Sequence, residues 1–218
     1  GNPLSDWKAM EADGYAFLRE RFRQAAGLYH MARMDHFRGY EAYWSVPAGA
    51  LTAEGGRWHK GPGLRLFRAM EEEAPGFPIL AEDLGVITPE VHNLRNILGY
   101  RGMLVWPFSQ EEIREGMYEG ENTVLYSGTH DTNTLAGWLE EQGRSPQDAG
   151  REAAAVLEEL AASPAALVIF PVQDLLGLGG EGRINTPGTV WGNWAWRLKE
   201  KSKELEEKLQ NLASIRKS

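Results

Sequence analysis

Five short apolar runs divide this sequence, and each ends at polar side chains before an amphipathic stretch begins. Apolar runs that do not alternate with polar residues are typical of strands buried on both faces, as in a parallel sheet. The runs, which we expect to form five strands, cover residues 28–34, 77–81, 103–108, 123–126 and 166–172.

Helical patterns separate these runs. Apolar side chains recur at helical spacing in residues 14–26 and 64–74. Thr88-Pro89-Glu90 and Ser145-Pro146-Gln147-Asp148 have the composition of helix starts, the second before an alanine-rich run to residue 162. Strand and helix therefore alternate, which predicts an α/β fold.

The C-terminal residues 194–217 are rich in charge, and we expect a helix there. Its predicted apolar stripe consists of Leu198, Leu205, Leu209 and Leu212. The chain contains no linker, internal repeat or low-complexity tract, so we expect residues 1–218 to belong to one domain without an internal boundary.

Two architectures can use such an alternation. A nucleotide-binding sheet requires a glycine-rich turn after its first strand, and Met34-Asp35-His36-Phe37 is not such a turn. A (β/α)₈ barrel places its chemistry at the carboxyl ends of its strands, which fits polar residues that follow each apolar run. Five strands are too few to close a barrel, so we expect part of one.

Charge and composition exclude several classes of partner. The net charge is −8 with scattered basic residues, which disfavours nucleic acid and anionic membrane as partners. No apolar run approaches the roughly 20 residues that span a bilayer. The chain has no cysteine, which excludes disulfides and favours a reducing compartment such as the cytoplasm. It begins at Gly1-Asn2-Pro3 without methionine, so we expect a trimmed or excised piece.

Asp35, Glu82 and Asp131 each follow a predicted strand. Parallel strands would bring all three to one rim. Arg33 lies two residues before Asp35, and an arginine beside an aspartate favours the ionised form that a nucleophile requires. Glu82 has no basic neighbour in sequence, and an apolar run precedes it. Such surroundings favour the protonated form of a carboxyl group, which a general acid requires. The alternative for each acid is a helix cap or an ion pair with a surface lysine.

One acid held ionised and another able to donate a proton is the arrangement used in glycoside chemistry. Aromatic residues support a sugar ligand, because rings exposed in loops can stack on the apolar faces of sugars. Tyr43, Trp44 and Trp58 lie in the glycine- and proline-containing segment after Asp35, which we expect to be a loop. The alternative is that these rings pack the loop against the rest of the fold.

Other chemistries lack their motifs. His130-Asp131 could bind a metal, but no second cluster with ligand spacing accompanies it, so we expect no metal. Residues 127–130 do not match the G-x-S-x-G pattern of a nucleophile elbow.

Several motifs, in order, resemble those of the amylomaltases. These are the 4-α-glucanotransferases of glycoside hydrolase family 77, called disproportionating enzymes in plants. The motifs that carry the resemblance are GNPL at residues 1–4, RMDHFRG at 33–39, AEDLG at 81–85, GTHD at 128–131, FPVQD at 170–174, RINTPG at 183–188 and NWAWR at 193–197.

The resemblance implies a (β/α)₈ barrel in which Asp35 is the nucleophile, Glu82 the general acid/base and Asp131 the transition-state stabiliser. Arg33 and His130 would be their neighbours around the donor sugar, and Asp83 would support the strand end. No cofactor is implied. The partners would be α-1,4-glucan oligosaccharides of starch, glycogen or maltodextrin metabolism, in the cytoplasm or, in a plant, the plastid.

Two departures from the family pattern affect this interpretation. Thr132-Asn133 stand where the family usually has asparagine and aspartate, so the surroundings of Asp131 differ. The family's chain is more than twice as long, so this piece would hold about strands 4 to 8. It could self-associate or pair with a missing N-terminal half. An inactive partial barrel and a related α-glucan hydrolase remain as alternatives.

Overall fold

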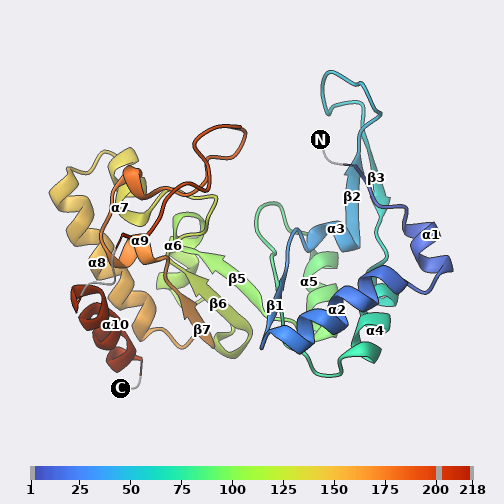
Figure 1. Ribbon diagram of the computed structural model, residues 1–218, viewed down its shortest axis with the longest axis horizontal. Coiled ribbons are helices and arrows are strands. Elements are labelled where there is room, and N and C mark those ends of the chain that lie inside the picture. The colour runs from blue at the N-terminus through green and yellow to red at the C-terminus, as the bar shows by residue number, and fades with distance from the viewer. Residues whose placement is uncertain (1–2, 200–202, 217–218) are drawn as a thin grey trace. The chain divides into compact units, whose positions relative to one another are not determined.

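The computed structural model of the chain describes residues 3–199 and 203–216. Tertiary contacts divide it into two compact units, Gly1–Met103 and Leu104–Ser218 (Figure 1). Each unit has its own apolar core and combines helices with strands. Mixed helix and strand content agrees with the predicted α/β class.

The first unit is built on two parallel strands. β1 (Ala32–Met34) pairs with β4 (Ile79–Ala81), and Met34 lies opposite Ala81, so the two strands end side by side. All three residues of β4 are buried, as expected of a strand inside an α/β core. A parallel bridge joins Leu80 to Arg101 on the other side of β4.

The apolar core of the first unit joins β4 to its helices. Phe37, at the turn after β1, is fully buried. Its ring centroid lies 5.5 Å from that of Phe67 and 6.3 Å from that of Tyr100. Burial raises the pKa of Tyr100 to about 12, so its phenol stays neutral at ordinary pH. The helices of this unit are α1 (Trp7–Ala12), α2 (Ala16–Leu28), α3 (Arg38–Glu41), α4 (Gly63–Glu73) and α5 (Pro89–Leu98).

An antiparallel hairpin stands where the sequence predicts a loop. β2 (Ala42–Ser45) pairs with β3 (Arg57–Lys60), and the two strands extend from the first unit to a tip at residues 46–56 (Figure 1). The loop prediction is wrong for these strands. All of β3 is exposed, so no apolar pattern marks it, and cross-strand pairs such as Trp44 with Trp58 stabilise it instead.

The second unit contains a three-stranded sheet of order β5-β6-β7. β5 (Gly102–Val105) crosses the boundary after Met103, and β6 (Thr123–Tyr126) runs parallel to β7 (Leu167–Ile169). Helices complete an apolar core around Leu125 and Leu160. They are α6 (Trp106–Arg114), α7 (Leu135–Glu141), α8 (Pro146–Ala162), α9 (Val172–Leu175) and α10 (Lys203–Ile215), with 3₁₀ turns η1 (Gly120–Asn122) and η2 (Gly180–Gly182).

The predicted elements are present, but several have different ends. β6 matches its apolar run, β4 covers the last three residues of the run 77–81, and Ser145 caps α8 as its sequence predicts. The runs 103–108 and 166–172 each contain the start of a helix, because Pro107 and Pro171 stand at helix N-termini, where a missing N–H costs nothing. The run 28–34 is a strand only over its last three residues.

The predicted C-terminal helix is shorter than expected. Residues 194–199 are not helical, residues 200–202 and 217 lie outside the described residues, and α10 begins at Lys203. Leu205 and Leu212 are buried, whereas Leu198 and Leu209 are 42% and 45% exposed, so the stripe prediction is wrong for two of its four leucines. Within residues 3–199 and 203–216, no helix is both long and apolar enough to cross a membrane.

Candidate active site

Asp35 and Glu82 follow the two neighbouring strands of the first unit at the same end. The register places Met34 opposite Ala81, and the next residue of each strand is the candidate acid. Backbone hydrogen bonds continue past the strands: the Glu82 N–H donates to the Met34 carbonyl at 3.0 Å, and the Phe37 N–H donates to the Glu82 carbonyl at 3.0 Å. The buried ring of Phe37 therefore holds the segment that carries Asp35 against the end of β4.

Arg33 lies beside Asp35, as their spacing predicts. A guanidinium N–H donates to Asp35 Oδ1 at 2.6 Å. The Asp35 side chain remains 75% exposed, so a ligand could approach its second oxygen. An exposed carboxylate with one oxygen held by a fixed arginine has the geometry of a nucleophile or an electrostatic stabiliser.

Two backbone N–H groups hold the Glu82 carboxylate. His36 N–H donates to Oε2 at 2.8 Å, and Leu84 N–H donates to Oε1 at 3.1 Å. His36 has φ = 48°, in the left-handed region that non-glycine residues rarely adopt. Strained backbone of this kind is concentrated at functional sites, where the surrounding structure over-determines it. The sequence gives no signal for this conformation, because His36 appears there only as part of a family motif.

Asp83 has a structural partner, as predicted. Its side chain is 5% exposed and accepts a hydrogen bond from the Arg95 guanidinium at 2.5 Å and from Met103 N–H at 3.0 Å. Gly102 leaves room for this pair, since a Cβ there would lie 2.8 Å from Asp83 Oδ2. Asp83 thus joins α5 to the start of β5 directly behind Glu82.

We expect Asp83→Ala to lower the free energy of unfolding by about 3 kcal/mol, because it leaves a partly buried guanidinium without its carboxylate. The matched control is Glu11→Ala, whose ion pair with Arg65 is exposed and should contribute at most about 1 kcal/mol. Urea unfolding of both variants measures the difference. Equal losses in the two variants would contradict the supporting role of Asp83.

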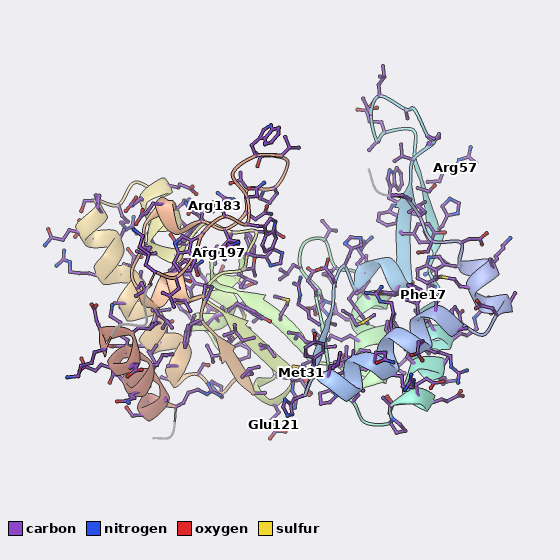
Figure 2. All side chains as sticks on the ribbon, in the orientation of Figure 1. Phe17, Met31, Arg57, Glu121, Arg183 and Arg197 are labelled. Atoms are coloured by element: carbon purple, nitrogen blue, oxygen red, sulfur yellow. The ribbon has the colours of Figure 1, made fainter. Side chains whose placement is uncertain are left out.

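The second unit holds Asp131 in the loop between β6 and α7. Asn185 donates to Asp131 Oδ1 at 2.6 Å, and Arg183 donates to the Asp131 carbonyl at 3.1 Å. His130 Nε2 lies 3.2 Å from Asp131 Oδ2, and the His130 ring lies 5.2 Å from that of Trp194. Arg183 lies at the start of a long non-helical segment, of which residues up to 199 are described (Figure 2).

Asn185 and Trp194 were not identified as site residues from the sequence. Both occur in motifs of the family resemblance, which was the available signal. Thr132 and Asn133, the two residues that differ from the family pattern, form hydrogen bonds in the same loop. Thr132 Oγ1 accepts from Thr129 N–H at 2.9 Å, and the Asn133 amide donates to Glu141 at 2.8 Å.

The aromatic residues of the hairpin are divided between packing and exposure. Trp44 Nε1 donates to the Ala53 carbonyl at 2.9 Å, so this ring packs under the hairpin tip. Trp58 is 54% exposed, and the Arg38 guanidinium lies 4.4 Å from its ring centroid. Tyr43 stacks on His59 at 5.6 Å. Trp58 is therefore the most accessible of the three predicted sugar-binding rings.

In the part of the chain that the structure describes, no three or more His, Asp or Glu side chains gather in a way that could hold a metal ion. Two candidate carboxylates lie at adjoining strand ends in the first unit, and in the second unit a third carboxylate lies beside a histidine. Such groups can act as nucleophile, proton donor and charge stabiliser.

Residues 1–203 match the sequence pattern that defines one family, described as 4-alpha-glucanotransferase. The chain belongs to the 4-alpha-glucanotransferase family. This confirms the resemblance seen in the sequence motifs.

Two relatives and one solved structure illustrate the membership. The chain is 40% identical to the 4-alpha-glucanotransferase of Streptococcus pneumoniae serotype 4, over 99% of this chain and 46% of the relative. It is 42% identical to the chloroplastic/amyloplastic 4-alpha-glucanotransferase of Arabidopsis thaliana, over 91% of this chain and 37% of the relative. The fold matches amylomaltase from Streptococcus agalactiae in complex with acarbose, with a TM-score of 0.89 and 28% identity, over 100% of this chain and 47% of that one. The chain therefore spans less than half the length of these 4-alpha-glucanotransferases.

Proposed function

We propose that this chain is the C-terminal portion of a 4-alpha-glucanotransferase that moves α-1,4-linked glucan segments between oligosaccharides with retention of configuration. The observation that carries the proposal is the pair of carboxylates, Asp35 and Glu82, at adjoining ends of parallel strands. Membership of the 4-alpha-glucanotransferase family supports it.

In the first step of the proposed reaction, an Asp35 carboxylate oxygen attacks the anomeric carbon and forms a glycosyl ester. The glycosidic C–O bond breaks, and Glu82 gives its proton to the departing oxygen. Backbone N–H groups of His36 and Leu84 orient Glu82 for this transfer. Asp131 holds the donor sugar's hydroxyls while positive charge develops at the ring.

In the second step, Glu82 takes the proton of an acceptor 4-hydroxyl. The acceptor oxygen bonds to the anomeric carbon, and the ester bond to Asp35 breaks, which restores both carboxyls. The reaction needs no cofactor, because the two carboxyls supply nucleophile, acid and base.

The proposal assigns substrate-binding roles around these acids. Arg33 and His130 lie against Asp35 and Asp131 and would contact the donor sugar. Tyr43, Trp44 and Trp58 would stack on glucose rings, with Trp58 the strongest candidate because more than half of its side chain is open. The acarbose bound to the Streptococcus agalactiae amylomaltase supports an oligosaccharide ligand.

We also propose that residues 1–218 provide about strands 4 to 8 of one (β/α)₈ barrel, with the other strands on a missing N-terminal half. The parallel pairs β1–β4 and β6–β7 and the length of the relatives support this. The protein would work in the cytoplasm or, if its source is a plant, in the plastid, as the name of the Arabidopsis relative indicates for that enzyme.

Incubation of the full-length protein with maltotriose tests the reaction type. A transferase should yield glucose together with a ladder of chains longer than maltotriose, because a sugar hydroxyl resolves the intermediate. The α-glucan hydrolase alternative predicts glucose and maltose without longer chains, because water resolves it. Asp35→Asn is the control and should form neither set of products.

A further inference from the structure

One buried carboxylate in the second unit has no role in the proposed reaction. Asp174, on α9, is 4% exposed and belongs to no ion pair among the described residues. Its Oδ2 accepts from the Ser127 hydroxyl at 2.6 Å, and its Oδ1 accepts from Leu135 N–H at 2.7 Å. Burial raises the pKa of Asp174, and these two hydrogen bonds oppose the rise.

The two donors stand at opposite ends of one loop. Ser127 follows the last residue of β6, and Leu135 is the first residue of α7. Residues 128–134 between them carry His130 and Asp131. The two carboxylate oxygens of Asp174 therefore each hold one end of this loop by a hydrogen bond.

The loop 128–134 packs closely against the Asp174 carboxylate. A Cβ at Gly128 would lie 2.9 Å from Thr132 Oγ1 and 3.5 Å from Asp174 Oδ2, so only glycine fits without a shift. At its far end, the Thr134 hydroxyl donates to the Gly179 carbonyl at 2.9 Å. Between these fixed ends, Asn185 donates to Asp131 Oδ1 at 2.6 Å, and His130 Nε2 lies 3.2 Å from Asp131 Oδ2.

Removing this carboxylate would leave two buried donors, the Ser127 hydroxyl and Leu135 N–H, without a partner and would cost stability, so a loss of stability alone does not show what Asp174 does. The two hydrogen bonds of Asp174 also fix the positions of the loop ends that they hold. We propose that Asp174 is a positioning residue, which fixes the loop 128–134 so that Asp131 meets the donor sugar in the correct place. The inference rests on the role of Asp131 in the proposed function.

A double-mutant cycle in the full-length protein tests this, with acarbose as the probe and calorimetric Kd as the readout. We expect Asp174→Ala to weaken acarbose binding about tenfold and to slow transfer from maltotriose about a hundredfold, because a catalytic group displaced by 1 Å loses rate on that scale. In an Asp131→Asn background, the same change should weaken acarbose less than about twofold further, since residues that act through one another are not additive.

Three variants separate positioning from stability. Leu160→Ala opens a cavity in the same core, so it should lower Tm without changing the Kd for acarbose. Asp174→Asn should restore most binding, because its amide oxygen can accept from Leu135 and its NH₂ can donate to the Ser127 hydroxyl. Ser127→Ala removes only one of the two hydrogen bonds, so it should weaken acarbose binding and slow transfer by a smaller factor. This variant tests the proposal if Asp174→Ala does not fold.

The outcomes distinguish this inference from the proposed function. If Asp131→Asn binds acarbose poorly but the loss from Asp174→Ala is the same in both backgrounds, the positioning role is wrong and the role of Asp131 stands. If Asp131→Asn binds acarbose and transfers glucan normally, both are wrong. An Asp174→Ala variant that lowers Tm alone, like Leu160→Ala, also overturns the inference.

Discussion

Glu82→Gln in the full-length protein is expected to slow glucan transfer by about 10²- to 10⁴-fold, the usual contribution of a general acid/base. Glutamine keeps the shape of the side chain and can still accept a hydrogen bond from His36 N–H. It cannot give a proton to the departing glycosyl oxygen or take one from the acceptor. Transfer from maltotriose, followed by chromatography of the products, measures the loss.

An α-glucosyl fluoride donor tests whether the lost function is proton donation. Fluoride leaves with little protonation, so the first step with Glu82→Gln should approach the rate of the unmodified protein, seen as a burst of fluoride. The matched control is Glu72→Gln, an exposed acid on α4, which should leave transfer unchanged. Equal failure of Glu82→Gln toward the fluoride and toward maltotriose would show that Glu82 is not the acid.

The 218-residue chain alone is expected to self-associate and to show little or no disproportionation of maltotriose. A barrel links strand number, tilt and stagger, so about five strands cannot close one. Among the described residues, β1 pairs only with β4 and β7 only with β6, and such edges invite pairing with another chain. Leu28 and Tyr29, just before β1, are 70% and 62% exposed. Covering apolar surface of this kind with another copy of the chain stabilises the association by about 25 cal/mol per Å².

Adding the missing N-terminal half should restore part of the activity, since Asp35, Glu82 and Asp131 are all on this chain. Light scattering, together with a maltotriose assay with and without that half, gives the measurement. The chain carrying Asp35→Asn, mixed with the same N-terminal half, is the control and should remain inactive. A monodisperse monomer with full transferase activity would contradict the prediction.

The sequence by itself determined the α/β class, the positions of most strands and the family. Short apolar runs and helix starts such as Ser145-Pro146 are local signals, because burial of a strand and capping of a helix depend on adjacent residues. The contact between Arg33 and Asp35 was predictable for the same reason, since they are two residues apart.

Tertiary structure decided what depends on residues far apart in the chain. β3 is exposed and forms because it pairs with β2, and His36 takes φ = 48° where its N–H meets Glu82, 46 residues away. Asp174 meets Ser127 47 residues away, and Asn185 meets Asp131 54 residues away. No local pattern of side chains encodes such partners, because their hydrogen bonds exist only once separate segments have packed together.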